Sequence, residues 1–367
     1  MDADSVTVGV EEEFLLADPE TGAPVAKNVE VARTAAELGV DLQLELTRCQ
    51  VETSTGVHTN STELARELRD LRCSIATCAE KNGAQLLAVA IPPTVPDKFP
   101  VTDTPRYQRI AESFGMLAHE QGLCGCHVHV AVPDRDTALQ VSNFLRPWLP
   151  LFLALTANSA IYRGADTGYA SWRSILWRRW PSAGPPPYFE SSHDYDAMVA
   201  MMLSSGSILD KKMVYWDVRP SSTFPTVEIR VSDVPATVEE TVLLATLVRA
   251  TVMTARMSLA QNNSAPAVGA ELVRAAYWKA ARTGLDGDAV DPRCGRIVPV
   301  RDMIAELIEY VGPALDELGD RQLVTDSLAA ILARGNGAIR QLAAFRARRN
   351  VDDVIAELAA ATLEGCR

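Results

Sequence analysis

The sequence lacks the features that mark several common classes of protein. Only six of its 35 basic residues are lysines, and 47 acidic residues give a formal net charge of −12. So acidic a chain argues against non-specific nucleic-acid binding. No run of about 18 apolar residues predicts a membrane-spanning helix, and the first residues lack the positive charge and apolar core of a signal peptide. We therefore expect a cytoplasmic protein with no nucleic acid and no membrane among its partners.

Disulfide bonds and several common motifs are not indicated either. Seven cysteines, an odd number, make no disulfide framework in 367 residues and favour a reducing compartment. The P-loop pattern GxxxxGK(S/T) and the GxSxG turn of hydrolases are absent, and Gly335-Asn336-Gly337 lacks the third glycine of a dinucleotide fingerprint. What is present is an ordinary globular composition, 47% hydrophobic and 22% charged, in which arginine supplies most of the positive charge. Arginine suits bidentate capture of carboxylate or phosphate.

Four segments show the alternation of a half-buried β-strand, in which successive side chains point to opposite faces. They span residues 6–16, 41–47, 126–132 and 226–232. In each segment one face is apolar and the other carries Glu, His or Arg. We therefore expect an antiparallel sheet with a chemically active face. Helical periodicity is clearest over residues 61–80, 106–121, 137–162, 237–261, 270–282, 301–318 and 321–347.

Two pairs of carboxylates lie in or directly after the first two of these segments. Glu11 and Glu13 share one strand face, about 7 Å apart by strand geometry, and repel each other unless a positive charge lies nearby. Divalent metal ions would supply that charge; a solvated acidic strand edge is the alternative. Glu45 and Glu52 are seven residues apart, so a bend near residues 47–50 is needed to bring both to one site. Two ordinary surface glutamates remain the alternative for that pair.

The run Cys124-Gly-Cys-His-Val-His129 places two imidazoles on one strand face. It is consistent with a zinc site of Cys and His, or with an imidazole ligand in a mainly carboxylate site. Cys126 points away from His127 and His129 in a regular strand, and no CxxC pair supplies further zinc ligands. A structural histidine is the remaining alternative.

Glu228 and Arg230 likewise share one face of the last strand, and Asp217 and Arg219 repeat the arrangement upstream. Either pair forms a local ion pair, which is weak if exposed. Alternatively, the carboxylate is a metal ligand beside an arginine that grips phosphate.

Taken together, these segments resemble the carboxylate–amine ligase family, the bacterial type 2 glutamate–cysteine ligases. The matching stretches include VGVEEEFLLADPETG (8–22), QVETST (50–55), GCHVHV (125–130), WDVRPSSTFPTVEIRVSDVPATVEE (216–240) and WKAARTGLDG (278–287). The resemblance implies a glutamine synthetase-like α+β fold, in which a curved antiparallel sheet forms a funnel and helices pack outside. It implies one catalytic domain over residues 1–367, largely helical from about residue 300.

The resemblance also implies a reaction and its cofactors. ATP and Mg²⁺ (or Mn²⁺) would phosphorylate the γ-carboxylate of glutamate, and an amine, with cysteine as the default acceptor, would attack the γ-glutamyl phosphate. The products would be a γ-glutamyl amide, ADP and phosphate. Glutamate and the amine are the expected small-molecule partners, and a homodimer is compatible with the family.

The resemblance further implies a role for each site residue. The metal ligands would form two groups: Glu11, His127 and Glu228 on the ATP phosphates, and Glu13, Glu45 and Glu52 toward the acyl phosphate. Arg230 would grip the transferred phosphate, and Arg173 and Arg219 would bind substrate carboxylate or phosphate. His129 would face the substrate and, with Arg230 and Glu52, take part in catalysis.

The sequence departs from the family pattern at Ala276-Tyr277-Trp278-Lys279, where the family usually has Asn-Arg-Trp. If that region shapes the acceptor pocket, the amine differs from cysteine and the ligase serves a specialised pathway. Two other classes remain as alternatives. One is a zinc metallohydrolase in which the His127/His129 pair activates water, and the other is a non-catalytic scaffold stabilised by metal.

Overall fold

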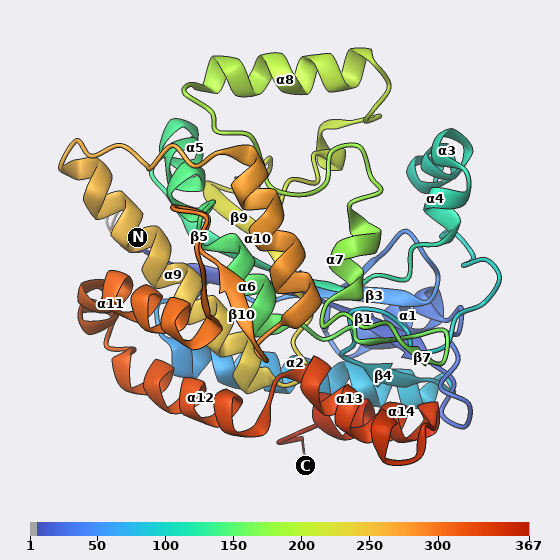
Figure 1. The fold of residues 1–367 in the computed structure, drawn as a ribbon. Coiled ribbons are helices and arrows are strands. Elements are labelled where there is room, and N and C mark those ends of the chain that lie inside the picture. The colour runs from blue at the N-terminus through green and yellow to red at the C-terminus, as the bar shows by residue number, and fades with distance from the viewer. Residues whose placement is uncertain (1–5, 367) are drawn as a thin grey trace.

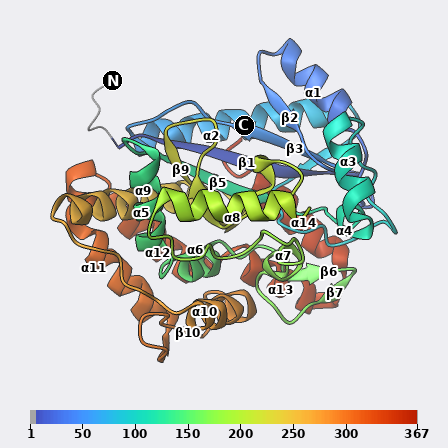
Figure 2. The same cartoon turned by 90° about the horizontal axis from the view of Figure 1, so that it is seen from above.

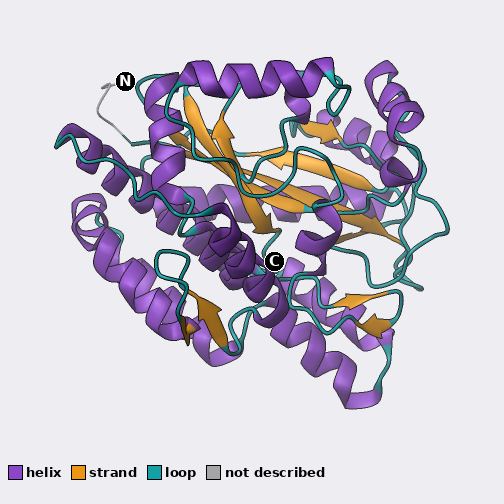
Figure 3. Ribbon diagram, turned by 45° about the horizontal axis from the view of Figure 1, so that its top comes forward, coloured by secondary structure: helices purple, strands orange, loops and turns teal. Residues whose placement is uncertain are grey.

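Seven strands form one antiparallel sheet in the computed structural model, which describes residues 6–366 (Figure 3). The strands are β1 (Val8–Ala17), β2 (Leu42–Leu44), β3 (Gln50–Ser54), β4 (Gln85–Leu87), β5 (Gly125–Ala131), β8 (Val218–Pro220) and β9 (Thr226–Asp233). Their order is β2-β3-β1-β5-β9-β8, and β4 pairs with the end of β1. The pairs β6 (Ile161–Tyr162) with β7 (Ala165–Asp166), and β10 (Asp288–Val290) with β11 (Ile297–Pro299), stand apart. The predicted antiparallel sheet is confirmed.

Helices surround this sheet (Figures 1 and 2). Those of the first half are α1 (Asn28–Glu37), α2 (Ser61–Lys81), α3 (Pro105–Phe114), α4 (Met116–His119), α5 (Arg135–Leu145), α6 (Leu149–Thr156) and α7 (Trp172–Trp177). Those of the second half are α8 (Ser192–Ser204), η1 (Lys211–Met213), α9 (Val238–Ala260), α10 (Ala270–Thr283), α11 (Val300–Leu318), α12 (Arg321–Arg334), α13 (Gly337–Arg348) and α14 (Val351–Thr362). Helix α8 stands alone at the top of the molecule in Figure 1. From Val300 to Thr362 the chain forms α11 to α14.

The apolar face of the sheet is covered by α2, α5, α6 and α9, which contribute side chains to one continuous core. Val10 of β1, Val128 of β5 and Ile229 of β9 are almost fully buried in it. Helix α9 is long and apolar enough to cross a membrane, but 72% of its most apolar window is buried inside the protein. It is therefore the central helix of this core, whereas the opposite face of the sheet carries polar side chains that line a cavity.

Three predicted helices are shorter than the sequence periodicity indicated. The helix predicted over 137–162 is two helices, α5 and α6, followed by β6. Pro147 and Pro150 lack the N–H that a continuous helix needs, and Pro150 stands in the first turn of α6. The other two helices break at Gly115 and Gly335, whose φ angles are +56° and +82°, a conformation that glycine adopts without strain.

A buried ion pair lies directly behind the polar face. Glu12 of β1 points into the apolar side, where Arg72 of α2 donates to its two oxygens at 2.6 and 3.1 Å. The hydroxyl of Thr241 in α9 donates to the same carboxylate at 2.7 Å, and Arg72 also donates to the carbonyls of Pro235 and Ala236. This network fixes β1 against α2 and α9.

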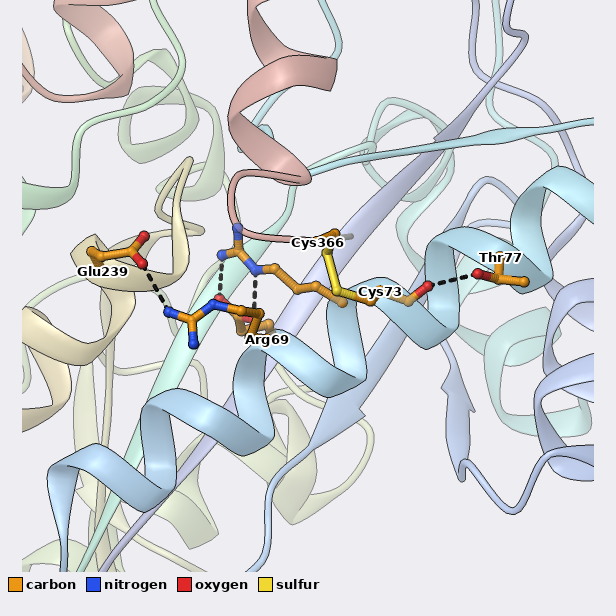
Figure 4. Close-up of a disulfide and its surroundings, with 7 residues drawn as sticks. Arg69, Cys73, Thr77, Glu239 and Cys366 are labelled. Atoms are coloured by element: carbon orange, nitrogen blue, oxygen red, sulfur yellow. Dashed lines mark hydrogen bonds and ion pairs between the residues drawn. A yellow bond between two sulfur atoms is a disulfide. The ribbon is translucent and has the colours of Figure 1, made fainter.

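The next residue of α2, Cys73, forms a disulfide with Cys366, and their Cα atoms are 5.5 Å apart (Figure 4). The cysteine count did not indicate a bond between residues 293 positions apart. Only the tertiary structure shows this bond, because the chain after α14 returns to α2. The bond attaches the C-terminal segment to the helix that carries Arg72.

We expect Arg72→Ala to lower the free energy of unfolding by about 3–5 kcal/mol, because it leaves the Glu12 carboxylate buried and unpaired. Urea denaturation at pH 7 measures this change. Arg69→Ala is the matched control on the same helix, since Arg69 pairs with Glu239 at 2.9 Å in an exposed position and should contribute less than about 1 kcal/mol. Equal losses in the two variants would contradict the assignment.

Candidate active site

A cavity of about 260 Å³ opens over the polar face of the sheet, and all ten predicted site residues line it. A second, less polar cavity of about 640 Å³ adjoins it along the first residues of β1. The two share Glu11, Gln43, His129 and Phe224. The acidic cluster therefore stands at the junction of a polar and a more apolar compartment.

Strand register brings the charged residues together. Glu11 of β1 lies opposite His127 of β5, Glu13 lies opposite Glu52 of β3, and His129 lies opposite Glu228 of β9. Directly opposite residues in an antiparallel pair point to the same face. The sheet alone therefore gathers side chains from four strands that are distant in sequence.

The ligand atoms fall into three overlapping groups, each with its members within 4.8 Å of one another. The groups are Glu11–His129–Glu228, Glu11–Glu52–His127 and Glu13–Glu45–Glu52. The structure brings together the predicted set of Glu13, Glu45 and Glu52. It regroups the other predicted set, because His129 rather than His127 joins Glu11 and Glu228.

The register between β5 and β9 is the reason for this regrouping, because it sets His129 directly opposite Glu228. A bulge in β9 follows this pair. Cys126 pairs with Ser232 and Val128 with Ile229, so two β9 residues, Arg230 and Val231, oppose the single His127. Bulges of this kind re-aim side chains next to functional sites. Here the Arg230 guanidinium lies 3.3 Å from His127 Nδ1, and the residues of β9 beyond the bulge change face.

Glu45 reaches the cluster through the predicted bend. The chain leaves β2 at Leu44 and enters β3 at Gln50, and Thr47 donates to the Gln50 side chain at 2.8 Å across the turn. Burial, with the charge of Glu13, raises the pKa of Glu45 to about 8. Burial and the neighbouring carboxylates also raise the pKa of Glu52 well above its ordinary value. The charge of Arg230 lowers both pKa values but does not offset burial and the neighbouring carboxylates.

The other part of the cluster is electrostatically satisfied. Burial would raise the pKa of Glu11, but hydrogen bonds and charge from His127 and His129 hold it well below its usual range. Burial would also raise the pKa of Glu228, but Arg230 and Arg219 lower it. His129 Nε2 lies 3.4 Å from Glu11 Oε1 and is buried without a hydrogen-bond partner.

The three predicted anion-binding arginines differ in how many donors they leave free. Arg219 holds Glu228 at 2.8 and 3.0 Å and also donates to the carbonyls of Lys212 and Val214. Arg230 pairs with Glu228 but keeps a buried Nε without a hydrogen-bond partner. Arg173, whose guanidinium lies near Gly125, also keeps a buried Nε without a partner. Buried donors are normally satisfied, so Arg173 and Arg230 are the better candidates for binding an anion.

The geometry does not support a zinc centre. None of the three ligand groups within residues 6–366 contains both imidazoles. Cys126 points into the apolar core, and burial raises the pKa of the Cys124 and Cys126 thiols well above the ordinary value. Both are therefore neutral at pH 7, whereas zinc binds thiolates.

Aromatic side chains form a wall of the cavity that sequence analysis missed. The rings of Trp177 and Tyr215 are 4.9 Å apart, and those of Trp180 and Tyr215 are 5.6 Å apart. A clue was available, because Trp177 ends the stretch NSAIYRGADTGYASWRSILW and Trp180 begins the stretch WPSAGPPPYF, and both stretches also resemble the family named above. The departure at residues 276–279 does not line the cavity. Tyr277 is buried against Arg178, whose Cζ is 4.8 Å from the ring centroid.

Comparisons with known proteins agree on one family. The sequence model of glutamate-cysteine ligase family 2 matches residues 7–357. A Nocardia farcinica protein with the provisional name glutamate–cysteine ligase 2-1 is 74% identical over 363 residues, 99% of this chain and 95% of that protein. A protein of Mycobacterium sp. (strain KMS), provisionally named glutamate–cysteine ligase 2-2, is 60% identical over 358 residues, 97% of this chain and 98% of that protein.

Two solved structures share the fold at low sequence identity. A bifunctional glutathione synthetase from Pasteurella multocida has a TM-score of 0.69 and 15% identity; the match covers 98% of this chain and 52% of that one. This chain therefore spans about half the length of that protein. A glutamate–cysteine ligase from Francisella tularensis, in complex with AMP, has a TM-score of 0.67 and 12% identity, with 98% and 89% covered. The predicted glutamine synthetase-like α+β fold is confirmed.

We expect the metal-free protein to lose stability as pH rises from about 4.5 to about 8. In this window the folded state keeps the proton on Glu45 that the unfolded chain releases, since the pKa is raised from 4.5 to about 8. Glu45→Gln cannot ionise, so it should raise the free energy of unfolding at pH 8 by something on the order of a few kcal/mol. Unfolding in EDTA at several pH values measures this.

Glu112→Gln, an exposed glutamate of α3, is the control and should leave the pH profile unchanged. A wild-type stability that stays constant or rises between pH 5 and 8 would contradict the repulsion inferred for Glu45.

Proposed function

The chain belongs to glutamate-cysteine ligase family 2, and from this premise we propose that it is an ATP-dependent ligase that joins the γ-carboxylate of glutamate to an amine. Cysteine is the default acceptor. The observation that carries the proposal is the crowding of five glutamates, two histidines and Arg230 around the junction of two cavities. We propose that residues 1–367 act as one catalytic unit, in the cytoplasm; the homodimer stays a prediction.

The two cavities suggest how the substrates divide the site. The larger, less polar cavity, whose lining includes the exposed Val57, Phe224 and Pro225, suits the nucleoside of ATP. The triphosphate would then extend toward Glu11, His129 and Glu228, and the smaller cavity would hold glutamate and the amine. The complex of the Francisella tularensis ligase with AMP is consistent with a nucleotide site in this fold.

The acidic cluster fits Mg²⁺ or Mn²⁺. Its donors are carboxylate oxygens with one imidazole in each of two groups, a set that hard divalent ions accept. The raised pKa values of Glu45 and Glu52 support this proposal, because added positive charge would stabilise their ionised forms. Glu11, His129 and Glu228 would hold the ion on the ATP phosphates, with further ions between His127, Glu52, Glu13 and Glu45. Bound there, such ions neutralise phosphate charge during transfer.

The chain's own residues then account for the chemistry. An amine and a carboxylate do not condense at neutral pH, so the γ-carboxylate must first gain a leaving group. Arg230, whose Nε is free, would stabilise the charge on the transferred phosphoryl group. Arg173 would hold the carboxylate of glutamate that does not react. The amine would attack the γ-glutamyl phosphate and release phosphate.

We expect ADP and phosphate, formed one for one with a γ-glutamyl amide, when the protein turns over ATP, Mg²⁺, glutamate and an accepted amine. A panel of amines with mass-spectrometric detection identifies the acceptor, and nucleotide chromatography identifies the products. Arg230→Ala should lower the rate of phosphoryl transfer about 10²–10³-fold, because a preorganised donor at a developing charge contributes that much. AMP and pyrophosphate as main products would refute the acyl-phosphate route.

We expect Glu11→Gln or Glu13→Gln to remove most activity and weaken Mg²⁺ binding without unfolding the protein, because each deletes a charged oxygen ligand. Isothermal titration with Mg²⁺ and far-UV circular dichroism measure binding and fold. Chelators should abolish wild-type activity, and Mg²⁺ or Mn²⁺, but not Zn²⁺, should restore it. Near wild-type turnover in either variant at saturating Mg²⁺ would disprove the ligand assignment, while Glu112→Gln serves as the unaffected control.

A further inference from the structure

Asp233, the last residue of β9, faces the polar side of the sheet although strict alternation assigns it to the apolar side. Val227, Ile229 and Val231 point into the core, and Asp233 follows them at the same spacing. The bulge opposite His127 shifts this alternation, so Asp233 pairs with Gly125. Because opposite residues share a face, Asp233 lies on the side of Glu228 and His129, beneath the cavity.

Asp233 is fully buried and surrounded by donors. The backbone N–H of Asn158 and the hydroxyl of Ser159 donate to its Oδ2 at 2.9 and 2.7 Å, and the hydroxyl of Ser171 donates to its Oδ1 at 2.9 Å. Arg173 NH1 lies 3.8 Å from the same Oδ1. Asp233 does not line either cavity of the site, so it acts on substrate only through a neighbour.

That neighbour is Arg173, whose backbone is fixed through two serines bound to Asp233 and whose guanidinium lies near the Asp233 carboxylate. Ser171, bound to Asp233, caps the N-terminus of α7, the helix that carries Arg173. Ser159, also bound to Asp233, accepts the backbone N–H of Arg173 at 3.1 Å. The Asp233 carboxylate thus fixes the backbone of Arg173 and attracts its guanidinium, while the buried Nε remains without a partner.

Gly125 provides the space for this guanidinium. A Cβ at position 125 would overlap the terminal nitrogen NH2 of Arg173, and it would lie 3.2 Å from Cζ of Arg173 and 3.4 Å from Nε2 of His127. The Gly125 N–H still donates to Glu13 at 2.5 Å, a bond that alanine would keep. A single added methyl group would therefore displace the Arg173 head and leave the strand hydrogen bonds in place.

We propose that Asp233 and Gly125 are positioning residues, which together aim Arg173 at the unreacted carboxylate of glutamate. Asp233 attracts the guanidinium from below, and the missing side chain at Gly125 lets it lie beside His127 at the floor of the cavity. The choice of glutamate as ligand rests on the proposed function; the positioning itself rests on the contacts of Asp233, Gly125 and Arg173.

Steady-state kinetics of the whole protein test the proposal through Asp233→Asn and Gly125→Ala. Both should raise KM for glutamate about tenfold or more, since hydrogen bonds to charged groups contribute about 1.5–3 kcal/mol. KM for ATP and the kcat should change far less. In an Arg173→Gln background neither substitution should raise KM for glutamate further, because the group that they position is gone.

Gly125→Ala keeps the test valid if Asp233→Asn fails to fold, because it leaves every hydrogen bond of Asp233 intact. An unchanged KM for glutamate in a folded Gly125→Ala protein, or full additivity with Arg173→Gln, would overturn the proposal.

A structural readout separates this proposal from the proposed function. The NMR signal of Arg173 Nε–H, identified by its loss in Arg173→Gln, should shift in Asp233→Asn and Gly125→Ala without any substrate present. If the signal shifts but the protein neither binds nor consumes glutamate, the assignment of glutamate as substrate is wrong, while Asp233 and Gly125 still position Arg173. An unshifted signal would disprove the positioning, whatever the substrate is.

Discussion

Repulsion among carboxylates on one face of a sheet is the constraint on which the rest of this structure depends. Glu11, Glu13, Glu45, Glu52 and Glu228 lie around one cavity, where low solvent exposure makes like charges costly. Part of the cluster is relieved by histidines and arginines. The remainder, around Glu45 and Glu52, keeps pKa values above the ordinary range. Such a site is unfavourable alone, and bound cations would make it favourable, as the proposed phosphoryl transfer requires.

The apolar side of the sheet opposes this repulsion with packing and one buried ion pair. Helices α2 and α9 cover the back of β1, and Arg72 neutralises Glu12 between Glu11 and Glu13. Three consecutive glutamates can therefore occupy one strand, because alternation sends the middle one to a partner of its own. The disulfide between Cys73 and Cys366 also attaches the C-terminal segment to α2 (Figure 4).

The register between β5 and β9, together with one bulge in β9, organises several parts of the site. The register sets His129 opposite Glu228, and Arg230 lies beside His127. The bulge turns Asp233 to the polar face. One extra residue in a strand reverses the face of everything beyond it. Of the two arginines proposed to bind anions, Arg173 depends on this irregularity, because its partner Asp233 lies beyond the bulge.

The sequence by itself determined four of the seven strands of the sheet, their two faces and ten of the residues that line the polar cavity, because side-chain alternation and residue chemistry are local properties. Spacing also showed that only a bend would bring Glu45 to Glu52, but it left open whether the bend forms. Only the tertiary structure decided which imidazole joins Glu228, which arginine keeps free donors and which aspartate supports Arg173. It also revealed the partners of Glu12 and Cys73. These features depend on the register between distant strands and on how α2, α7 and the C-terminal segment pack, and neither is written in any local stretch of residues.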